Sequence, residues 1–364
     1  MSAHRIAFLL PHFRAGGAER VVLNWVGALD RSRFKPLLVL GRVEGAFLDL
    51  LPPDVQPIVL GGRALTRPAR IARLLREEEV SLAYAATNAM NLALLAAPTT
   101  TLRIVSEHTP PGAYLDEAKW RWLRQAAMRR LYPRADAIAV PTAPIATELA
   151  ALLGGGPQPT VLPNPVIEAV PHTLPRRALA GPPLRIVAAG RLVPAKGFDL
   201  LVDACARLRD RGHDVHATIH GEGAGHVALA RSIAAAGLCD RVVLAGHADP
   251  LAASLAAADL CVVPSRREGF GNVAIEAMAV GTPVLATRSG GPESFIRDRV
   301  NGFLAPAGDA EALADAIAGL AEKPARLDAV CEAGLETARG FTVAAATRRF
   351  EALLDSLLPR STPV

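Results

Sequence analysis

Long apolar runs are missing from this chain of 364 residues, although 51% of its residues are hydrophobic. No segment approaches the roughly 18 to 20 uninterrupted apolar residues that a membrane-spanning helix needs. The apolar run near the N-terminus, Ile6 to Leu10, is too short for the core of a secretory signal peptide. We therefore expect a cytoplasmic protein.

Cysteine is also scarce, and the cysteines follow no spacing typical of metal ligands. Cys205, Cys239, Cys261 and Cys331 are far apart in the sequence, which favours reduced thiols over a disulfide framework. The chain has no D-x-D pair of aspartates, no repeat of solenoid period and no low-complexity tract. We therefore expect no metal and no other cofactor.

The charge of the chain is unbalanced in the basic direction, with a formal net charge of +5. A basic protein suits an anionic partner, which can be nucleic acid, a membrane surface or a phosphorylated substrate. Charge alone does not choose among these partners. Because no nucleic-acid-binding motif is present, nucleic acid is not an expected partner.

Strand-like apolar segments alternate with helical patterns, which predicts parallel sheets covered by helices on both faces. The alternation restarts at Leu184, after a segment with four prolines and no apolar period. We therefore expect an α/β domain over residues 1–167, a linker over residues 168–183 and a second α/β domain over residues 184–342.

The most informative stretch runs from Pro264 to Gly281, where an apolar strand-like run passes through two glycines into a helical pattern. Backbone N–H groups and the helix dipole at such a turn favour phosphate. Glu268 and Glu276 bracket the turn with seven residues between them, and carboxylates can hold sugar hydroxyls. Taken alone, the two glutamates could equally be solvated surface residues.

A second glycine-rich turn follows the first strand of the second half, and Arg191 and Lys196 flank it. Two cations beside a helix N-terminus can neutralise a diphosphate leaving group. The alternative is a pair of solvated surface cations. A further turn, Gly221 to Gly225, lacks the G-x-G-x-x-G spacing of dinucleotide-binding proteins, so NAD is not expected.

Two features of the first half also point to ligand binding. Gly16 and Gly17 place bare backbone at a predicted helix start, although such pairs often only close a tight turn. His108 follows a predicted strand that ends at Glu107, at the sheet edge where ligands bind in open α/β folds. A lone histidine is more often structural, but this position favours a functional role.

Together these motifs resemble the E-x7-E signature and the basic glycine-rich turn of the family-4 retaining glycosyltransferases, and the resemblance covers nearly the whole chain. The resemblance implies the GT-B fold, with two Rossmann-like doubly wound domains facing across a cleft. It also implies that the C-terminal helix, residues 343–364, packs back on the first domain. The family usually has Asn-Gly where this chain has Asn164-Pro165, which puts a hinge at this position in doubt.

The resemblance assigns a catalytic group and a donor-binding group of residues. The catalytic group is Glu268, Lys196, Arg191 and His108. The donor-binding group is Gly16, Gly17, Gly190, Gly246, Gly269, Phe270, Gly271, Asn272, Val273 and Glu276.

The implied reaction moves a sugar from a nucleotide diphosphate sugar, most simply a UDP-sugar, to a hydroxyl of a lipid-linked or polysaccharide acceptor. The resemblance implies retention of configuration, no metal and a place in cell-envelope or exopolysaccharide synthesis. The alternatives are a GT-B sugar-nucleotide epimerase or phosphorylase, or an inert sugar-nucleotide-binding partner of another transferase. The residues do not reveal the donor sugar, the base, the acceptor, the linkage or the oligomeric state.

The segment Asp116 to Tyr132 predicts a helix rich in arginine. Its apolar stripe, expected to face the core, comprises Trp120, Leu123, Ala127 and Leu131. Its opposite face comprises Arg121, Trp122, Arg129 and Tyr132. Aromatic rings among arginines suit an anionic membrane surface, so we expect a candidate peripheral contact with the inner face of the membrane. The alternative is that Trp122 packs beneath a loop and the arginines only keep the surface soluble.

Overall fold

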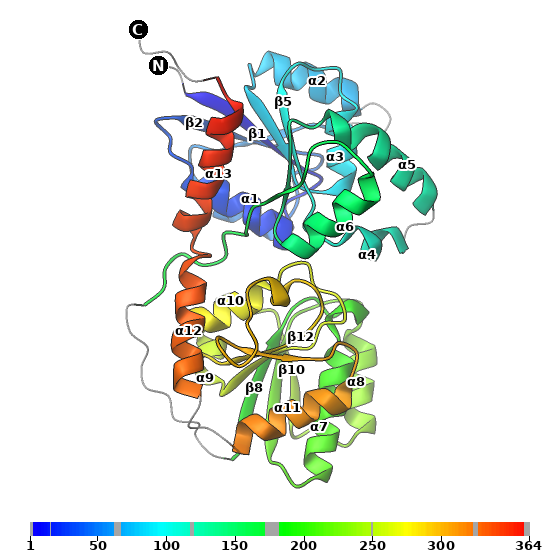
Figure 1. Ribbon diagram of the computed structural model, residues 1–364, viewed down its shortest axis with the longest axis vertical. Coiled ribbons are helices and arrows are strands. Elements are labelled where there is room, and N and C mark those ends of the chain that lie inside the picture. Colours follow the sequence, from blue (N-terminus) through cyan, green and yellow to red (C-terminus); the bar gives the residue numbers. More distant parts are fainter. Residues whose placement is uncertain are drawn as a thin grey trace. The chain divides into compact units, whose positions relative to one another are not determined.

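The computed structural model describes residues 3–14, 16–61, 67–116, 120–171, 182–248, 250–322 and 327–359. The chain divides into two compact units (Figure 1). Unit 1 comprises Met1–Val166 and Val343–Val364, and unit 2 comprises Ile167–Thr342. The boundary therefore lies one residue from the expected end of the first domain. Within the expected linker, residues 172–181 lie outside the described part of the chain.

Unit 1 is built on a parallel sheet in the order β3-β2-β1-β4-β5-β6-β7. Its strands are β1 (His4–Leu10), β2 (Phe34–Leu40), β3 (Pro57–Val59), β4 (Leu82–Ala85), β5 (Leu102–Ser106), β6 (Ala137–Val140) and β7 (Thr160–Val161). The central strand β1 pairs with β2 and β4, so Ile6 lies opposite both Pro36 and Leu82. Residues 6–10 are all buried because helices cover both faces of this sheet.

The helices of unit 1 are α1 (Gly17–Ala28), α2 (Arg67–Glu77), α3 (Asn88–Leu95), α4 (Pro111–Asp116), α5 (Arg121–Leu131), α6 (Ala143–Leu153) and α13 (Val343–Leu357). The C-terminal helix α13 completes the core of this unit. Phe350 of α13 stacks on Trp25 of α1 with ring centroids 4.4 Å apart, and it meets Tyr84 of β4 edge-on at 5.6 Å. Such aromatic pairs contribute about 0.5–1.5 kcal/mol each beyond their buried area.

Unit 2 is built on a second parallel sheet, in the order β10-β9-β8-β11-β12-β13. Its strands are β8 (Leu184–Ala189), β9 (Val215–His220), β10 (Val242–Gly246), β11 (Leu260–Val263), β12 (Val284–Thr287) and β13 (Phe303–Ala305). Its helices are α7 (Phe198–Asp210), α8 (His226–Ala235), α9 (Ala252–Ala257), α10 (Asn272–Ala279), α11 (Ala310–Glu322) and α12 (Leu327–Arg339). The strand order reverses beside β8, which makes the carboxyl ends of β8 and β11 a site for ligands in this class of fold.

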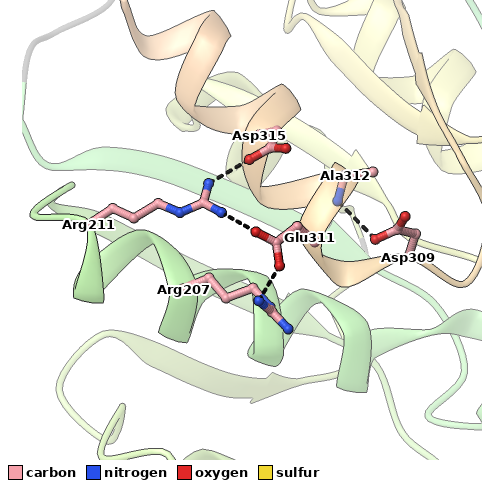
Figure 2. A network of polar contacts seen from close by, with 6 residues as sticks. All are labelled: Arg207, Arg211, Asp309, Glu311, Ala312 and Asp315. Carbon is pink, nitrogen blue, oxygen red and sulfur yellow. Dashed lines mark hydrogen bonds and ion pairs between the residues drawn. The ribbon is translucent and has the colours of Figure 1, made fainter.

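An ion-pair network joins α7 to α11 on the surface of unit 2 (Figure 2). Arg211 donates to Glu311 at 2.6 Å and to Asp315 at 2.5 Å, while Arg207 donates to the other oxygen of Glu311. Exposed pairs of this kind contribute about 0–1 kcal/mol each. The apolar core between α7 and the sheet, which includes Leu201 and Leu208, therefore contributes most of the stability at this face.

The expected helix over residues 116–132 was wrong in two respects. Helix α4 ends at Asp116 and α5 begins at Arg121, while residues 117–119 lie outside the described part of the chain. The expected core face was also wrong, because the buried side chains of this segment are those of Met128 and Tyr132. Trp120 (59%) and Leu123 (47%) of the expected core face are exposed instead, while Trp122 (62%) is exposed as its place on the opposite face predicted. The cause is tertiary packing, since Tyr132 is drawn inward to a polar cluster beside β5.

Candidate functional site

In unit 2, glycines allow the loops at the carboxyl ends of the strands to pack closely. Gly197 adopts a φ of 65°, and a side chain there would collide with the carbonyl oxygen of Pro264. Gly221 donates its N–H to the carbonyl of Gly246 at 2.7 Å, and a side chain on Gly221 would collide with Gly190. The turns after β8, β9, β10 and β11 thus form one close-packed edge, and the predicted residues Gly190 and Gly246 lie in it.

The structure brings Lys196 and Glu268 together at this edge. Lys196 ends the 3₁₀ turn Pro194–Lys196, and its Nζ lies 2.6 Å from Oε2 of Glu268. The hydroxyl of Ser265 donates to the same oxygen at 3.0 Å. Because both charged side chains are largely buried, this charge-assisted hydrogen bond is stronger than a surface ion pair.

The backbone around Glu268 is held from the neighbouring loop. The N–H of Glu268 donates to the carbonyl of Ser289 at 2.9 Å, and Gly291 donates to the carbonyl of Glu268 at 2.8 Å. A side chain on Gly291 would collide with the backbone of Phe270. The loop after β12 therefore holds the backbone of Glu268, while Lys196 and Ser265 hold its carboxylate.

Arg266 is a supporting residue that the sequence motifs did not single out. Its guanidinium binds both oxygens of Asp199 at 2.6 Å and donates to the carbonyl of Pro194 at 3.1 Å. This pairing lowers the pKa of Asp199, mainly through the hydrogen bonds from Arg266. Arg266 therefore ties the turn that carries Lys196 to the loop that carries Glu268.

Arg191 differs from Lys196, because its side chain is exposed and has no ion pair among the described residues. It follows directly on Gly190 at the end of β8. An exposed guanidinium at the sheet edge that carries Lys196 can attract an anion.

Helix α10 begins at this edge with the predicted residues 269–273. Gly271 precedes it with a φ of 100°, a left-handed conformation that glycine adopts without strain. Asn272 and Val273 form its first turn and are half-buried. Because a helix N-terminus carries a partial positive charge, this end of α10 favours an anion.

Phe270 and Glu276 occupy different places around α10. The ring of Phe270 is buried against Phe295 and Phe341, with centroids 5.4 Å away in each case, so only its backbone can reach a ligand. Glu276 is half-buried in the second turn of α10. Burial, and secondarily the charge of Glu276, raises the pKa of Cys261 on β11, which places this carboxylate close to the sheet.

In unit 1, His108 follows β5, and two hydroxyls face one of its ring nitrogens. Nε2 lies 3.1 Å from Oγ of Ser106 and 3.5 Å from the hydroxyl of Tyr84. Burial lowers the pKa of His108 to about 4. The imidazole is therefore neutral at pH 7 and can exchange hydrogen bonds with a hydroxyl-bearing ligand.

Glu107, which precedes His108, is the centre of a buried polar cluster. Its Oε1 accepts hydrogen bonds from Nδ2 of Asn88 at 3.0 Å, from Nδ2 of Asn91 at 3.2 Å and from the hydroxyl of Tyr132. Burial raises the pKa of Glu107. The cluster ties α3 and the end of α5 to the strand that carries His108. In the sequence, the only indication of this cluster is that Glu107 directly precedes His108.

The predicted glycines Gly16 and Gly17 differ in their surroundings. A side chain on Gly16 would collide with the carboxylate of Glu19, whereas a side chain on Gly17 would meet no atom of the described residues within 4 Å. Oε1 of Glu19 lies 3.4 Å from Nδ1 of His12. Neither Glu19 nor His12 was among the predicted site residues.

Within the described ranges, no group of three or more His, Cys, Asp and Glu side chains is arranged to hold a metal ion. Nor does any helix in the described part of the chain combine the length and the apolar character needed to cross a membrane.

Two family models match the chain. The model described as "Glycosyltransferase Family 4" matches residues 15–169, and the model described as "Glycosyl transferases group 1" matches residues 183–323. Together these models cover most of both units.

Two curated relatives share more than a third of the aligned residues. The lipopolysaccharide core biosynthesis glycosyltransferase LpsE of Rhizobium meliloti is 38% identical over 172 residues, which are 47% of this chain and 49% of LpsE. The D-inositol 3-phosphate glycosyltransferase of Kribbella flavida is 35% identical over 228 residues, which are 57% of this chain and 53% of that protein. The chain thus spans about half the length of the curated relatives it matches.

Solved structures resemble the chain over nearly its full length. The structure of Anabaena Alr3699/HepE in complex with UDP has a TM-score of 0.80 at 22% identity and covers 97% of this chain and 100% of that chain. A glycosyltransferase from Rickettsia africae has a TM-score of 0.80 at 16% identity and covers 99% of this chain and 100% of that chain. This likeness confirms the expected GT-B fold.

Proposed function

The chain belongs to the group 1, family 4 glycosyltransferases, and on that basis we propose that it transfers a sugar from a nucleotide diphosphate sugar to an acceptor hydroxyl. The observation that carries the proposal is the ion pair of Lys196 and Glu268 at the carboxyl ends of β8 and β11, beside the N-terminus of α10. Two cations and a helix N-terminus suit a diphosphate, while two carboxylates suit sugar hydroxyls.

In the proposed reaction, the departing diphosphate carries the charge that unit 2 must stabilise. Lys196 and Arg191 supply positive charge and the first turn of α10 supplies backbone dipoles. In a site that excludes water, the loss of one such contact costs about 2.7–4 kcal/mol at the transition state. Glu276 binds the ribose hydroxyls, and Glu268 orients the donor sugar while it holds Lys196.

We further propose that the reaction retains the anomeric configuration and needs no metal. In this scheme two protein cations replace a divalent ion as the partner of the diphosphate. The leaving phosphate accepts the proton of the incoming hydroxyl on the same face of the sugar. Neutral His108 in unit 1 binds a hydroxyl of the transferred sugar or of the acceptor.

We propose a UDP-sugar as donor and a lipid-linked or polysaccharide acceptor in cell-envelope or exopolysaccharide synthesis. The HepE structures in complex with UDP support the donor, and relatives named for lipopolysaccharide core biosynthesis support the acceptor.

The exposed side chains of Trp120, Trp122 and Leu123, which we call the α5 patch, support a peripheral membrane contact. Exposed arginines, among them Arg124 and Arg130, lie in the same helix. We propose that this patch rests on the anionic inner face of the membrane, where each cation contributes about 1 kcal/mol. The acceptor would then be lipid-linked and the protein cytoplasmic.

A mass-spectrometric screen tests the proposed function. UDP-glucose, UDP-galactose, UDP-N-acetylglucosamine and GDP-mannose are each incubated with lipid-linked and soluble glycan acceptors in the presence of EDTA. We expect one donor to give a glycosylated product, whose anomeric configuration NMR then assigns. A free epimer of the donor, which has the same mass and must be separated by chromatography, would indicate an epimerase, and binding without turnover would indicate an inert partner.

A further inference from the structure

His220 of unit 2 has no role in the reaction proposed above. It is the last residue of β9 and is half-buried, and its ring nitrogens Nδ1 and Nε2 are both shielded from solvent. Neither nitrogen has a hydrogen-bond partner among the described residues. Burial lowers the pKa of His220, so the ring is neutral at pH 7 and carries one N–H donor and one bare nitrogen. Buried polar atoms are rarely left unpaired, so these two nitrogens call for a reason.

A purely structural role does not account for a histidine at this position. Along β9, Ala217 and Ile219 point into the apolar core of unit 2, whereas His216, Thr218 and His220 point to the other face of the sheet. An apolar β-branched residue in place of His220 would suit a strand and would leave no polar side-chain atom unpaired. The imidazole therefore points to a ligand.

His220 lies on the face of the sheet that α10 covers with Glu276. Cys261 of β11 is the partner of Val187 in β8, and Ala189, two residues further along β8, is the partner of His220. Since side chains alternate along each strand, Cys261 and His220 point to the same face. Burial, and then the charge of Glu276, raises the pKa of Cys261, so Glu276 lies over this face as well. β9 and β11 are two strand spacings apart, about 10 Å, which a nucleoside and two hydrogen bonds can span.

The surface beside His220 is open on the side of β10. Gly246 is the partner of His220 in that strand, and a side chain on Gly246 would meet no atom of the described residues within 4 Å. Val243, which pairs with Thr218 on the same face, is 52% exposed, so the described helices leave this part of the face uncovered. Gly190 donates its N–H to the carbonyl of His220 at 2.9 Å and holds the backbone in place. A flat ring can therefore lie beside His220 without displacing a helix.

We propose that His220 binds the base of the donor nucleotide, through a hydrogen bond between one ring nitrogen and an edge of uracil. The inference rests on the proposed function and assigns recognition of the base to a named side chain. In the proposed reaction the diphosphate lies at the N-terminus of α10 and Glu276 holds the ribose. The base leaves the ribose on the side away from the diphosphate, so it extends from Glu276 across β8 toward β9. Because both nitrogens of His220 are shielded, the ring turns about its side-chain bonds to meet the base.

The first test follows the ring nitrogens directly. The protein is labelled with ¹⁵N-histidine, and the His220 resonances are assigned by their absence in His220→Asn. Titration with UDP should shift the resonance of at least one ring nitrogen of His220, whereas inorganic pyrophosphate should not, because it lacks the base. No shift at saturating UDP, or an equal shift with pyrophosphate, overturns the inference.

The second test measures affinity by isothermal calorimetry. His220→Ala should weaken the binding of UDP about fivefold to tenfold, which corresponds to one lost hydrogen bond, and should leave the binding of pyrophosphate unchanged. His220→Asn, which keeps a donor and an acceptor, should recover part of the loss. His216→Ala is the matched control, since His216 points to the same face from the start of β9 and pairs with Asp214 at 3.6 Å.

The outcomes separate this inference from the proposed function. An unchanged UDP affinity in His220→Ala, in a parent that binds UDP and transfers a sugar, overturns the role of His220 and leaves the transferase standing. An equal loss of UDP and pyrophosphate binding in His220→Ala also overturns it, because the change then acts on the fold of the site. A parent that binds neither UDP nor pyrophosphate contradicts the proposed function and this inference together.

Discussion

The ammonium of Lys196 lies 2.6 Å from the carboxylate of Glu268, although 72 positions separate the two residues in the chain. Under the proposed function, the diphosphate of the donor shares Lys196 with this carboxylate. Glu268 thus holds Lys196 in place, and under the proposed function it also repels the diphosphate that Lys196 is proposed to bind.

Glu268→Gln should therefore separate nucleotide binding from transfer. The variant removes the repulsion, so we expect UDP to bind several-fold more tightly, because one charge near a partly buried anion has been removed. Transfer should fall, since the donor sugar loses a carboxylate contact. Isothermal calorimetry and turnover measure the two effects, and Ser265→Ala is the control that leaves the charge in place. Weaker UDP binding in Glu268→Gln would contradict the account.

Glu276→Gln should weaken recognition of the ribose. A carboxylate accepts two hydroxyl hydrogen bonds, whereas an amide accepts fewer and also donates. We expect the affinities for UDP and for 2′-deoxy-UDP to approach each other in the variant, because the contact with the 2′-hydroxyl is the one lost. If the variant prefers the ribose as strongly as the parent does, Glu276 has another role.

Much of this site could be predicted from the sequence, because strand ends, glycine turns and charge spacing are local features. Lys196 and Glu268 were predicted separately, each from its own turn. The burial of Tyr132 could not be predicted, since a helical wheel shows which residues share a face but not which face the protein packs on. Arg266 was missed because its partner Asp199 is distant in the sequence.

The buried carboxyl of Glu107 predicts a pH dependence of stability. Burial raises its pKa above the ordinary value of 4.5, so the protonated form is favoured in the folded state. The stability from this group is fully present below pH 4.5 and is lost as the pH rises through the raised pKa. The glutamine of Glu107→Gln does not titrate. As the pH rises from 5 to 8, the free energy of unfolding of the parent should therefore fall relative to that of the variant.

Urea unfolding at the two pH values measures this difference. Glu107→Ala should be destabilised at both values by about 1–3 kcal/mol or more, because Asn88, Asn91 and Tyr132 lose their acceptor. A parent that gains stability relative to Glu107→Gln as the pH rises would show that the carboxylate is ionised in the folded protein.

The α5 patch should bind anionic vesicles in a salt-dependent way. Co-sedimentation at low salt should fall in Trp122→Ala, which removes an exposed ring, and in Arg124→Glu/Arg130→Glu, which reverses two charges. Val243→Ala is a matched control, because Val243 is an exposed apolar residue of unit 2. A parent that ignores anionic vesicles even at low salt would refute the membrane contact and favour a soluble acceptor.

The most direct test of the account is the rate of sugar transfer by Lys196→Ala, measured in EDTA with the donor and acceptor found in the screen. Because Lys196 is assigned to the leaving diphosphate, turnover should fall about 10²-fold or more while the variant remains folded. Lys35→Ala, which removes an exposed lysine of β2 in unit 1, should leave the rate unchanged. Near-normal transfer by Lys196→Ala would contradict the proposal that this edge of unit 2 stabilises a departing diphosphate.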